Sequence, residues 1–251
     1  MIKRPEDIEK IRKAGRILAQ VAKTILANAK EGVRLSRLDS LAKEFIGKAG
    51  GKPAFLGYQP YGANHPYPAS ICTSLNEVVV HGVPTDYALR SGDILKLDFG
   101  VTYHGWHADA AWTMGIGTIT DEARKLIKIT EQALFDGIKQ MKPGRNLGDI
   151  GWAISKTVNK YGFNVVDGLT GHGVGQELHE DPSVFNEGKR GSGMALEPGM
   201  VLAVEPMVSA GSPRIVQLKD ESYATEDKSL SAHFEHTVAI TDKGPEILTL
   251  I

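Results

Sequence analysis

The chain has 251 residues, with 29 Lys and Arg against 30 Asp and Glu, so its formal net charge is −1. This balance provides no overall field for attracting nucleic acid or an anionic membrane, and it excludes a binding protein that works by charge alone. The hydrophobic content of 41% can fill a large core, and the one cysteine, Cys72, excludes an intrachain disulfide framework and a thiolate-rich zinc site.

A first pair of helices is expected near the N-terminus. Residues 5 to about 30 open with a proline and two acidic residues, and apolar residues then recur at helical spacing. For the second helix, Ser36 and Asp39 resemble a capping box, and Gly50-Gly51 provides a stop. The pattern therefore predicts two consecutive amphipathic helices.

Three strands are expected next, over residues 71–80, 93–101 and 108–114. Asp98 lies in a run apolar enough to be buried, and Asp109 follows across a plausible hairpin turn. Such a hairpin would bring the two carboxylates close together, where they need a proton or a cation between them. A solvent-facing hairpin with two ordinary aspartates is the alternative on this pair alone.

A second pair of helices follows, from Asp121 to Met141 and from there to a shorter helix that ends near Tyr161. The two pairs superpose at an offset of 112 residues, which takes Lys30 to Lys142, Gly32 to Gly144, Leu35 to Leu147 and Gly50 to Gly162. This repeat predicts two αβ halves related by a pseudo-twofold axis, with a site between them. Helix pairs separated from runs of antiparallel strands indicate an α+β fold.

The glycine-rich segment 171–175 surrounds His172 and precedes His179. Glycines let a backbone and an imidazole approach a ligand closely, although a simple surface turn has equal support from the sequence. A phosphate-binding loop is disfavoured, because Pro182 intervenes and no suitable helix follows.

The last strands are expected over residues 200–208, 214–218 and 233–240. Glu205 ends the first of them, directly before a proline that cannot donate to a sheet ladder. In the last strand, the two-residue period places Glu235 on the same face as His233 and Thr237. Both glutamates need a partner if they are buried.

Together these motifs supply four carboxylates and at least one histidine on separate strands. Five ligands exceed what one tetrahedral zinc uses, and a carboxylate-rich set is typical of two metals ~3.5–4 Å apart. Two other catalytic interpretations have less support. Cys72 has no base fixed by spacing, and His107-Ala-Asp109 resembles a facial triad that would need a strand-dominated barrel.

These motifs resemble those of type I methionine aminopeptidases. The resemblance rests on LKLDFG with Asp98, the eleven-residue step to Asp109, GHGVGQELHEDP, AVEPM, LSAHFEHT and NEVVVHGVP, and it extends from about Pro5 to Ile251. It implies the α+β pita-bread fold, in which two pseudo-symmetric αβ halves, about 1–115 and 116–251, form one catalytic domain, 1–251, with an antiparallel sheet backed by helices.

The resemblance also implies removal of the initiator methionine from nascent proteins and peptides whose second residue is small, by hydroxide activated by two divalent cations (Co, Mn, Fe or Zn). The metal ligands would be Asp98, Asp109, His172, Glu205 and Glu235, with Asp109 and Glu235 bridging the ions. Glu205 would also transfer a proton, His179 would stabilise the tetrahedral intermediate, and His81 would contact the substrate amide.

For the methionine pocket, the resemblance points to Tyr58, Tyr67 and Cys72, with Leu178 beside His179. The sequence departs from the family pattern in three places. The loop 59–66 is longer than in common members, Leu178 replaces a phenylalanine of some members, and residues 220–223 lack a tryptophan that several members have. These departures leave the shape of the pocket and its tolerance at the second residue open.

The expected substrates are the N-termini of nascent polypeptides, and the ribosome is a candidate partner. Neither sequence-specific nucleic acid nor a membrane is expected as a partner, because no signal-peptide core and no run of ~18 apolar residues occurs. We expect a cytoplasmic monomer of the minimal prokaryotic form. Proline-specific peptidases of the same fold are the enzymatic alternative, and a non-catalytic scaffold is disfavoured because all five ligands are present.

Overall fold

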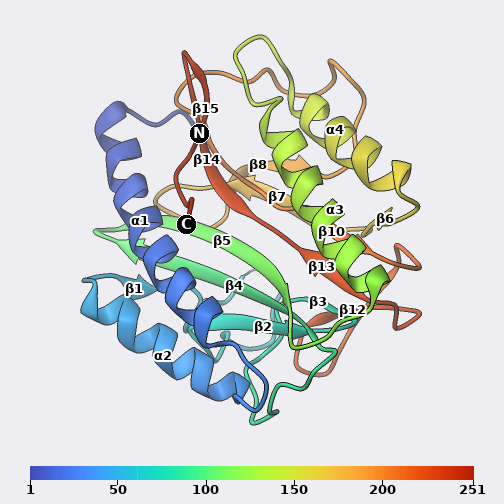
Figure 1. The fold of residues 1–251 in the computed structure, drawn as a ribbon. Coiled ribbons are helices and arrows are strands. Elements are labelled where there is room, and N and C mark those ends of the chain that lie inside the picture. The colour runs from blue at the N-terminus through green and yellow to red at the C-terminus, as the bar shows by residue number, and fades with distance from the viewer. Residues whose placement is uncertain (61) are drawn as a thin grey trace.

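The computed structural model describes residues 1–60 and 62–251; Tyr61, in the predicted loop 59–66, lies outside the described residues. Within these residues, four α-helices form the two predicted pairs (Figure 1). Their bounds are α1 Pro5–Asn28, α2 Leu35–Lys48, α3 Asp121–Ile138 and α4 Leu147–Lys160. No helix in this part of the chain combines the length and apolar character needed to cross a membrane.

The predicted capping box of α2 is wrong. The helix begins at Leu35, without a side-chain cap, and Ser36 already lies inside it. The Asp39 carboxylate instead accepts hydrogen bonds from the backbone amides of Ser70, at 2.7 Å, and Ile71, at 3.1 Å. Asp39 therefore ties the helix to the start of a neighbouring strand.

Helices α2 and α4 have equivalent surroundings as well as equivalent lengths, because the bounds of α4 are those of α2 shifted by 112 residues. The turns before the two helices contain Gly32 and Gly144, both at φ 83°, and those after them contain Gly50 and Gly162, both at φ 81°. The residues that precede the helices, Arg34 and Asn146, each form an isolated bridge, to Ala88 and Ala195. These correspondences are those expected of an internal duplication.

Strands β4 (Ile94–Tyr103) and β5 (Trp106–Gly115) form the predicted hairpin, at greater length than expected. Its turn is His104-Gly105, with both residues at positive φ, which matches the twist of a tight hairpin. In the register of the pair, Gly100 lies opposite Asp109, so Asp98 and Asp109 are diagonal neighbours on one face.

The remaining strands are short, and the pairings between strands are antiparallel. Their bounds are β1 Lys52–Pro53, β2 Ile71–Leu75, β3 Val78–Val80, β6 Asn164–Val165, β7 Thr170–Gly173, β8 Glu180–Phe185, β9 Val201–Val204, β10 Met207–Ser209, β11 Ile215–Gln217, β12 Tyr223–Thr225, β13 Ser231–His233, β14 His236–Thr241 and β15 Gly244–Ile247. One sheet joins β1, β4, β2 and β5, another has the order β15-β14-β9-β7-β8, and two three-stranded sheets have the orders β13-β10-β6 and β11-β12-β3.

Three runs that we expected to be single strands are each divided in two. The breaks fall at residues 76–77 between β2 and β3, at 205–206 between β9 and β10, and at 234–235 between β13 and β14. Two of these breaks contain a glutamate of the predicted ligand set. A residue that leaves the ladder can direct its side chain toward a site rather than into a strand-to-strand contact.

Strand β7 was not predicted, because its sequence is rich in glycine. A Cβ on Gly171 would lie 2.3 Å from the carbonyl oxygen of Ala203, and one on Gly173 would lie 2.4 Å from that of Asp181. The glycines thus allow β7 to fit between β8 and β9. The sequence left open whether the glycine-rich segment 171–175 is a surface turn, and the structure shows that its first residues belong to a strand.

The two helix pairs lie on the outside of the molecule, with the long strands between them (Figure 1). Leu18 and Leu38 from α1 and α2 pack with Phe99 of β4 in one apolar cluster. The cluster under α3 and α4 includes Leu134 and Ile154. The strands between the two helix pairs carry the predicted site.

Candidate metal centre and active site

The β4–β5 hairpin contributes Asp98 and Asp109. Asp109 is 3% exposed, and its Oδ1 accepts a hydrogen bond from Thr237 Oγ1 at 2.9 Å. The Thr237 hydroxyl oxygen also accepts from the Asp109 amide at 2.9 Å, so β14 holds this residue at two points. Asp98 Oδ1 is shielded from solvent and has no hydrogen-bond partner among the described residues.

Glu235 lies in the break between β13 and β14 and is 3% exposed. Its amide donates to the carbonyl oxygen of Ala111 at 2.9 Å, and its own carbonyl oxygen accepts from the Ala111 amide at 3.3 Å. These two bonds attach Glu235 to β5, beside Asp109. Glu205 follows the end of β9, and its carbonyl oxygen accepts from Asn186 Nδ2 at 2.9 Å.

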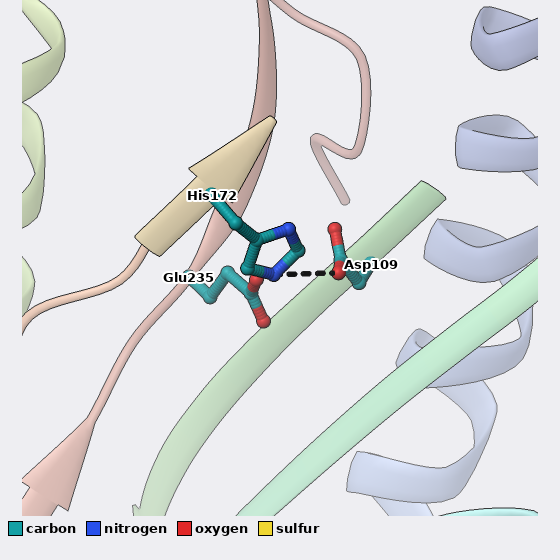
Figure 2. A group of neighbouring side chains, drawn as sticks. All are labelled: Asp109, His172 and Glu235. Carbon is teal, nitrogen blue, oxygen red and sulfur yellow. Dashed lines mark ion pairs between the residues drawn. The ribbon is translucent and has the colours of Figure 1, made fainter. Parts of the chain in front are cut away.

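His172, on β7, faces this group of carboxylates (Figure 2). Its Nδ1 lies 2.9 Å from the carbonyl oxygen of Gly173, an acceptor that only a protonated Nδ1 can satisfy. The other ring nitrogen, Nε2, lies 3.4 Å from Asp109 Oδ2 and 3.5 Å from Glu205 Oε1. The tautomer that the backbone favours leaves Nε2 available to a metal ion.

Asp109, His172 and Glu235 each offer a ligand atom, and these three atoms lie within 4.8 Å of one another. All five predicted ligands line one cavity of about 910 Å³. The donors are carboxylate oxygens and one imidazole nitrogen, a set that suits divalent cations. Asp98 Oδ1 has no hydrogen-bond partner among the described residues, and a bound cation would compensate its charge. The side chains therefore fit a metal centre.

The electrostatics of the cavity lead to the same conclusion. Burial raises the pKa of Asp98 to about 7 and, together with the negative charge of Asp109, the pKa of Glu205 to about 8. Burial and the neighbouring carboxylates raise the pKa of Glu235 well above its ordinary value. Without a cation these groups hold protons near neutral pH, and a bound cation would replace those protons.

His179 lies beside His172, with 4.3 Å between the ring centroids. Its Nδ1 is 2.6 Å from the Tyr58 hydroxyl, and burial lowers its pKa to about 3. The ring is therefore neutral at physiological pH and can donate one hydrogen bond. His81, at φ 61°, packs its ring edge against Tyr223, and burial lowers its pKa to about 4.

The predicted wall residues Tyr58, Tyr67, Cys72 and Leu178 all line the cavity. The Tyr67 hydroxyl donates to the carbonyl oxygen of Gly82, at 2.9 Å, and lies 3.2 Å from the carbonyl oxygen of Ile71, an alternative acceptor. Tyr67 is thereby oriented by the backbone. Burial raises the pKa of Cys72 well above its ordinary value, so its thiol stays protonated and does not act as a nucleophile.

Sequence reasoning missed His233 as a member of the site. Its Nε2 lies 3.3 Å from Glu205 Oε2, and its ring is buried. Burial lowers the pKa of His233 to about 4, so the ring is neutral. The signal was present in the sequence, since the two-residue period of the predicted strand placed His233 on one face with Glu235 and Thr237. Tyr223, which lines the cavity, had no comparable signal.

Comparison with known proteins gives the class first: the sequence matches metallopeptidase family M24 over residues 9–242, and the chain belongs to this family. More particularly, it is 46% identical to the methionine aminopeptidase of Clostridium perfringens, covering 100% of this chain and 99% of that one. The crystal structure of methionine aminopeptidase from Rickettsia prowazekii has a TM-score of 0.95 and 39% identity, covering 100% and 99% of the two chains. Prolidase from Pyrococcus furiosus shares the fold, with a TM-score of 0.80 and 24% identity, and this chain covers 65% of it.

These findings confirm the predicted family and its α+β pita-bread fold. Membership of a metallopeptidase family implies a divalent metal ion, for which Asp109, His172 and Glu235 form the candidate site. The oxygenase interpretation of His107 and Asp109 is therefore wrong.

Proposed function

We propose that this protein is a methionyl aminopeptidase, which hydrolyses the first peptide bond of proteins and peptides that begin with methionine and have a small second residue. The observation that carries this proposal is the grouping of four carboxylates and His172 around one cavity, in a chain that matches methionine aminopeptidases over its whole length. The family and the chemistry of the ligand set agree.

We propose two divalent cations per chain, from among Co, Mn, Fe and Zn. Asp109 and Glu235 would be shared by both ions, Asp98 would hold one, and His172 and Glu205 would complete the other. Bound in this way, the ions supply a nucleophile at neutral pH and polarise the scissile carbonyl. The protein contributes a rigid ligand set, because Thr237 holds Asp109 and Ala111 holds Glu235.

Glu205 is proposed to move the proton. As an ionised carboxylate beside the metal, Glu205 would accept a proton and deliver it to the departing amine. His179 donates a hydrogen bond to the developing oxyanion, and its neutral ring, oriented by Tyr58, leaves Nε2 free for this purpose. His81 contacts the substrate amide and orients the leaving group.

Tyr58, Tyr67 and Cys72 are proposed to form the methionine pocket. Aromatic rings and a neutral thiol suit an unbranched thioether, which gains from contacts between sulfur and ring edges. Phe55 lines the same cavity and meets Tyr67 edge to face, with 6.4 Å between the ring centroids. This contact stiffens the wall and supports selection of the first side chain by shape.

We also propose that residues 1–251 act as one catalytic domain built from two halves, about 1–115 and 116–251. The support is the 112-residue correspondence of the helix pairs and their glycine turns. The protein is proposed to act as a cytoplasmic monomer on nascent chains, with the ribosome as its place of encounter.

A peptide panel tests the proposed function. Protein freed of metal with a chelator receives Mn²⁺, Co²⁺ or Fe²⁺, and release of the first residue is measured from Met-Gly-Ser, Met-Ala-Ser, Met-Lys-Ser, Met-Phe-Ser and Gly-Pro. Cleavage of the first two alone supports the proposal. Equal rates across the panel would contradict the small-residue preference, and cleavage of Gly-Pro instead would favour a proline-specific peptidase.

A matched pair of variants connects this activity to the site. Asp109→Asn should abolish cleavage, because it removes a shared ligand. Asp121→Asn is the control, because Asp121 is an aspartate fully exposed at the start of α3. Comparable activity of the two variants would contradict the proposed ligand set.

A further inference from the structure

Lys96 is a buried lysine that the proposed mechanism does not use. The residue lies in β4 and is 1% exposed. Its ammonium donates to three neutral oxygens: the carbonyl oxygen of Asn76 at 2.7 Å, and the carbonyl oxygen and Oγ of Ser231, each at 3.2 Å. Burial of an ammonium is costly, so a chain that retains one needs it for contacts that an apolar side chain cannot make.

The three segments that meet at Lys96 each lead directly to a residue of the site. Lys96 precedes Asp98 by two residues in β4, so the two side chains share a strand face. Ser231 begins β13, four residues before Glu235. Asn76 lies in the turn before β3, which ends at Val80, next to His81.

Further hydrogen bonds join the same segments. The Ser231 amide donates to the carbonyl oxygen of Asn76 at 3.0 Å, and the Asn76 side-chain oxygen accepts from the Ile94 amide at 2.9 Å. The turn, β4 and β13 are thus bound around one point, and the Lys96 side-chain nitrogen is the donor that all three share. An apolar replacement would remove this shared donor, and the Ser231 carbonyl and hydroxyl oxygens would lose their bond to β4.

We propose that Lys96 is a positioning residue, whose ammonium sets the relative placement of Asp98, Glu235 and His81 by holding together the three segments that carry them. The part concerning His81 rests on the proposed function, since it concerns how His81 meets the substrate. The part concerning Asp98 and Glu235 is a statement about metal affinity, which can be measured without substrate.

The test compares Lys96→Met with Ile154→Ala, a control that removes core side-chain volume in α4, an element outside the three segments that meet at Lys96. The thermal midpoint, the Kd for Mn²⁺ by calorimetry on metal-free protein, and kcat and KM for Met-Ala-Ser are measured for both. Groups that orient metal ligands typically contribute 10–100-fold to metal affinity or activity. We expect Lys96→Met to weaken Mn²⁺ binding by about that factor and to lower kcat, while Ile154→Ala loses stability and keeps its Mn²⁺ Kd.

A Mn²⁺ Kd and a kcat within twofold of wild type in Lys96→Met would overturn the proposal, and so would a loss of Mn²⁺ affinity of the same size in Ile154→Ala. If Lys96→Met does not fold, Ser231→Ala takes its place, because it removes one of the three acceptors and keeps the lysine. It should weaken Mn²⁺ binding at least threefold, and an unchanged Kd would overturn the proposal. If wild-type protein binds Mn²⁺ but releases no methionine, the proposed function fails and the Mn²⁺ measurements still decide the role of Lys96.

Discussion

Metal-free protein should lose stability relative to metal-loaded protein as the pH rises from 7 to 8. The cause is the group of buried carboxylates whose pKa values are raised in the folded state. A raised pKa gives stability that is present below the unfolded pKa, about 4.5 for glutamate, and is lost as the pH rises through the folded value. Above pH 7 the unfolded carboxylates hold no protons, whereas the folded ones still do.

The size of the loss follows from the pKa values. Between pH 7 and 8, Glu205, with a pKa of about 8, lowers the free energy of unfolding by about 1 kcal/mol, and Glu235, whose pKa burial raises well above its ordinary value, adds to this loss. Four histidines with lowered pKa values, His81, His179, His233 and His236, oppose this loss by about 0.6 kcal/mol in total, and Lys96, whose pKa burial lowers to about 7, opposes it by about 1 kcal/mol. These five groups are common to the metal-free and the metal-loaded protein, so they cancel when the two forms are compared. Glu205 and Asp98, the latter at about 0.4 kcal/mol, together lower the stability of the metal-free protein relative to the loaded protein by about 1.4 kcal/mol, and Glu235 adds to this difference.

Urea unfolding followed by tryptophan fluorescence measures this change. Protein saturated with Mn²⁺ is the internal control, because its carboxylates carry no proton in the folded state while the histidines are unchanged. The chelated protein should therefore become less stable relative to the loaded protein as the pH rises. Glu205→Gln should make this difference in stability grow by about 1 kcal/mol less between pH 7 and 8. The reasoning is refuted if the two forms keep a constant difference in stability over this range.

The remaining predictions concern single residues of the site. His179→Ala should keep its Mn²⁺ affinity and lose about 10²–10³ in kcat, the usual loss for one donor to an oxyanion; metal loss in this variant would show that His179 is a ligand. His172→Ala should instead bind Mn²⁺ weakly and regain part of its activity at high Mn²⁺ concentration, as activity titrations can determine. Gly173→Ala should reduce stability by at least about 2 kcal/mol and weaken Mn²⁺ binding, because the new Cβ would meet the Asp181 carbonyl oxygen at 2.4 Å; a fully stable variant with wild-type affinity would contradict the close-approach argument.

Sequence reasoning predicted the helices and the long hairpin well, because each has a clear period. It failed for the segments that carry residues of the proposed site. β7 packs glycines against two neighbouring strands, so it has no side-chain alternation to detect. Glu205 and Glu235 interrupt runs that the apolar pattern predicts to be continuous strands. That pattern does not mark where a residue leaves the hydrogen-bonded ladder.

The candidate site was predictable to a similar degree. The five proposed ligands could be named, and they line one cavity, but their contacts depend on long-range packing. His233 illustrates the difference. It lies at the end of β13 and contacts Glu205, which follows β9, and no local sequence pattern encodes a contact between these distant segments. The Tyr67 hydroxyl, in turn, lies within hydrogen-bonding distance of the carbonyl oxygens of Ile71 and Gly82, which come together only in the folded chain.

The two halves of the chain contribute unequally to the proposed metal centre. Asp98 and Asp109 come from the β4–β5 hairpin, whereas His172, Glu205 and Glu235 all follow α4 in the chain. An ion held by both groups fastens one half to the other, and by thermodynamic reciprocity any strain that separates the halves must weaken its binding. A chain cut in the short connection 116–120 between β5 and α3 would therefore reassemble from its two fragments more tightly when the metal is supplied. In this arrangement the ion would also link the two halves, because neither half carries the whole proposed ligand set.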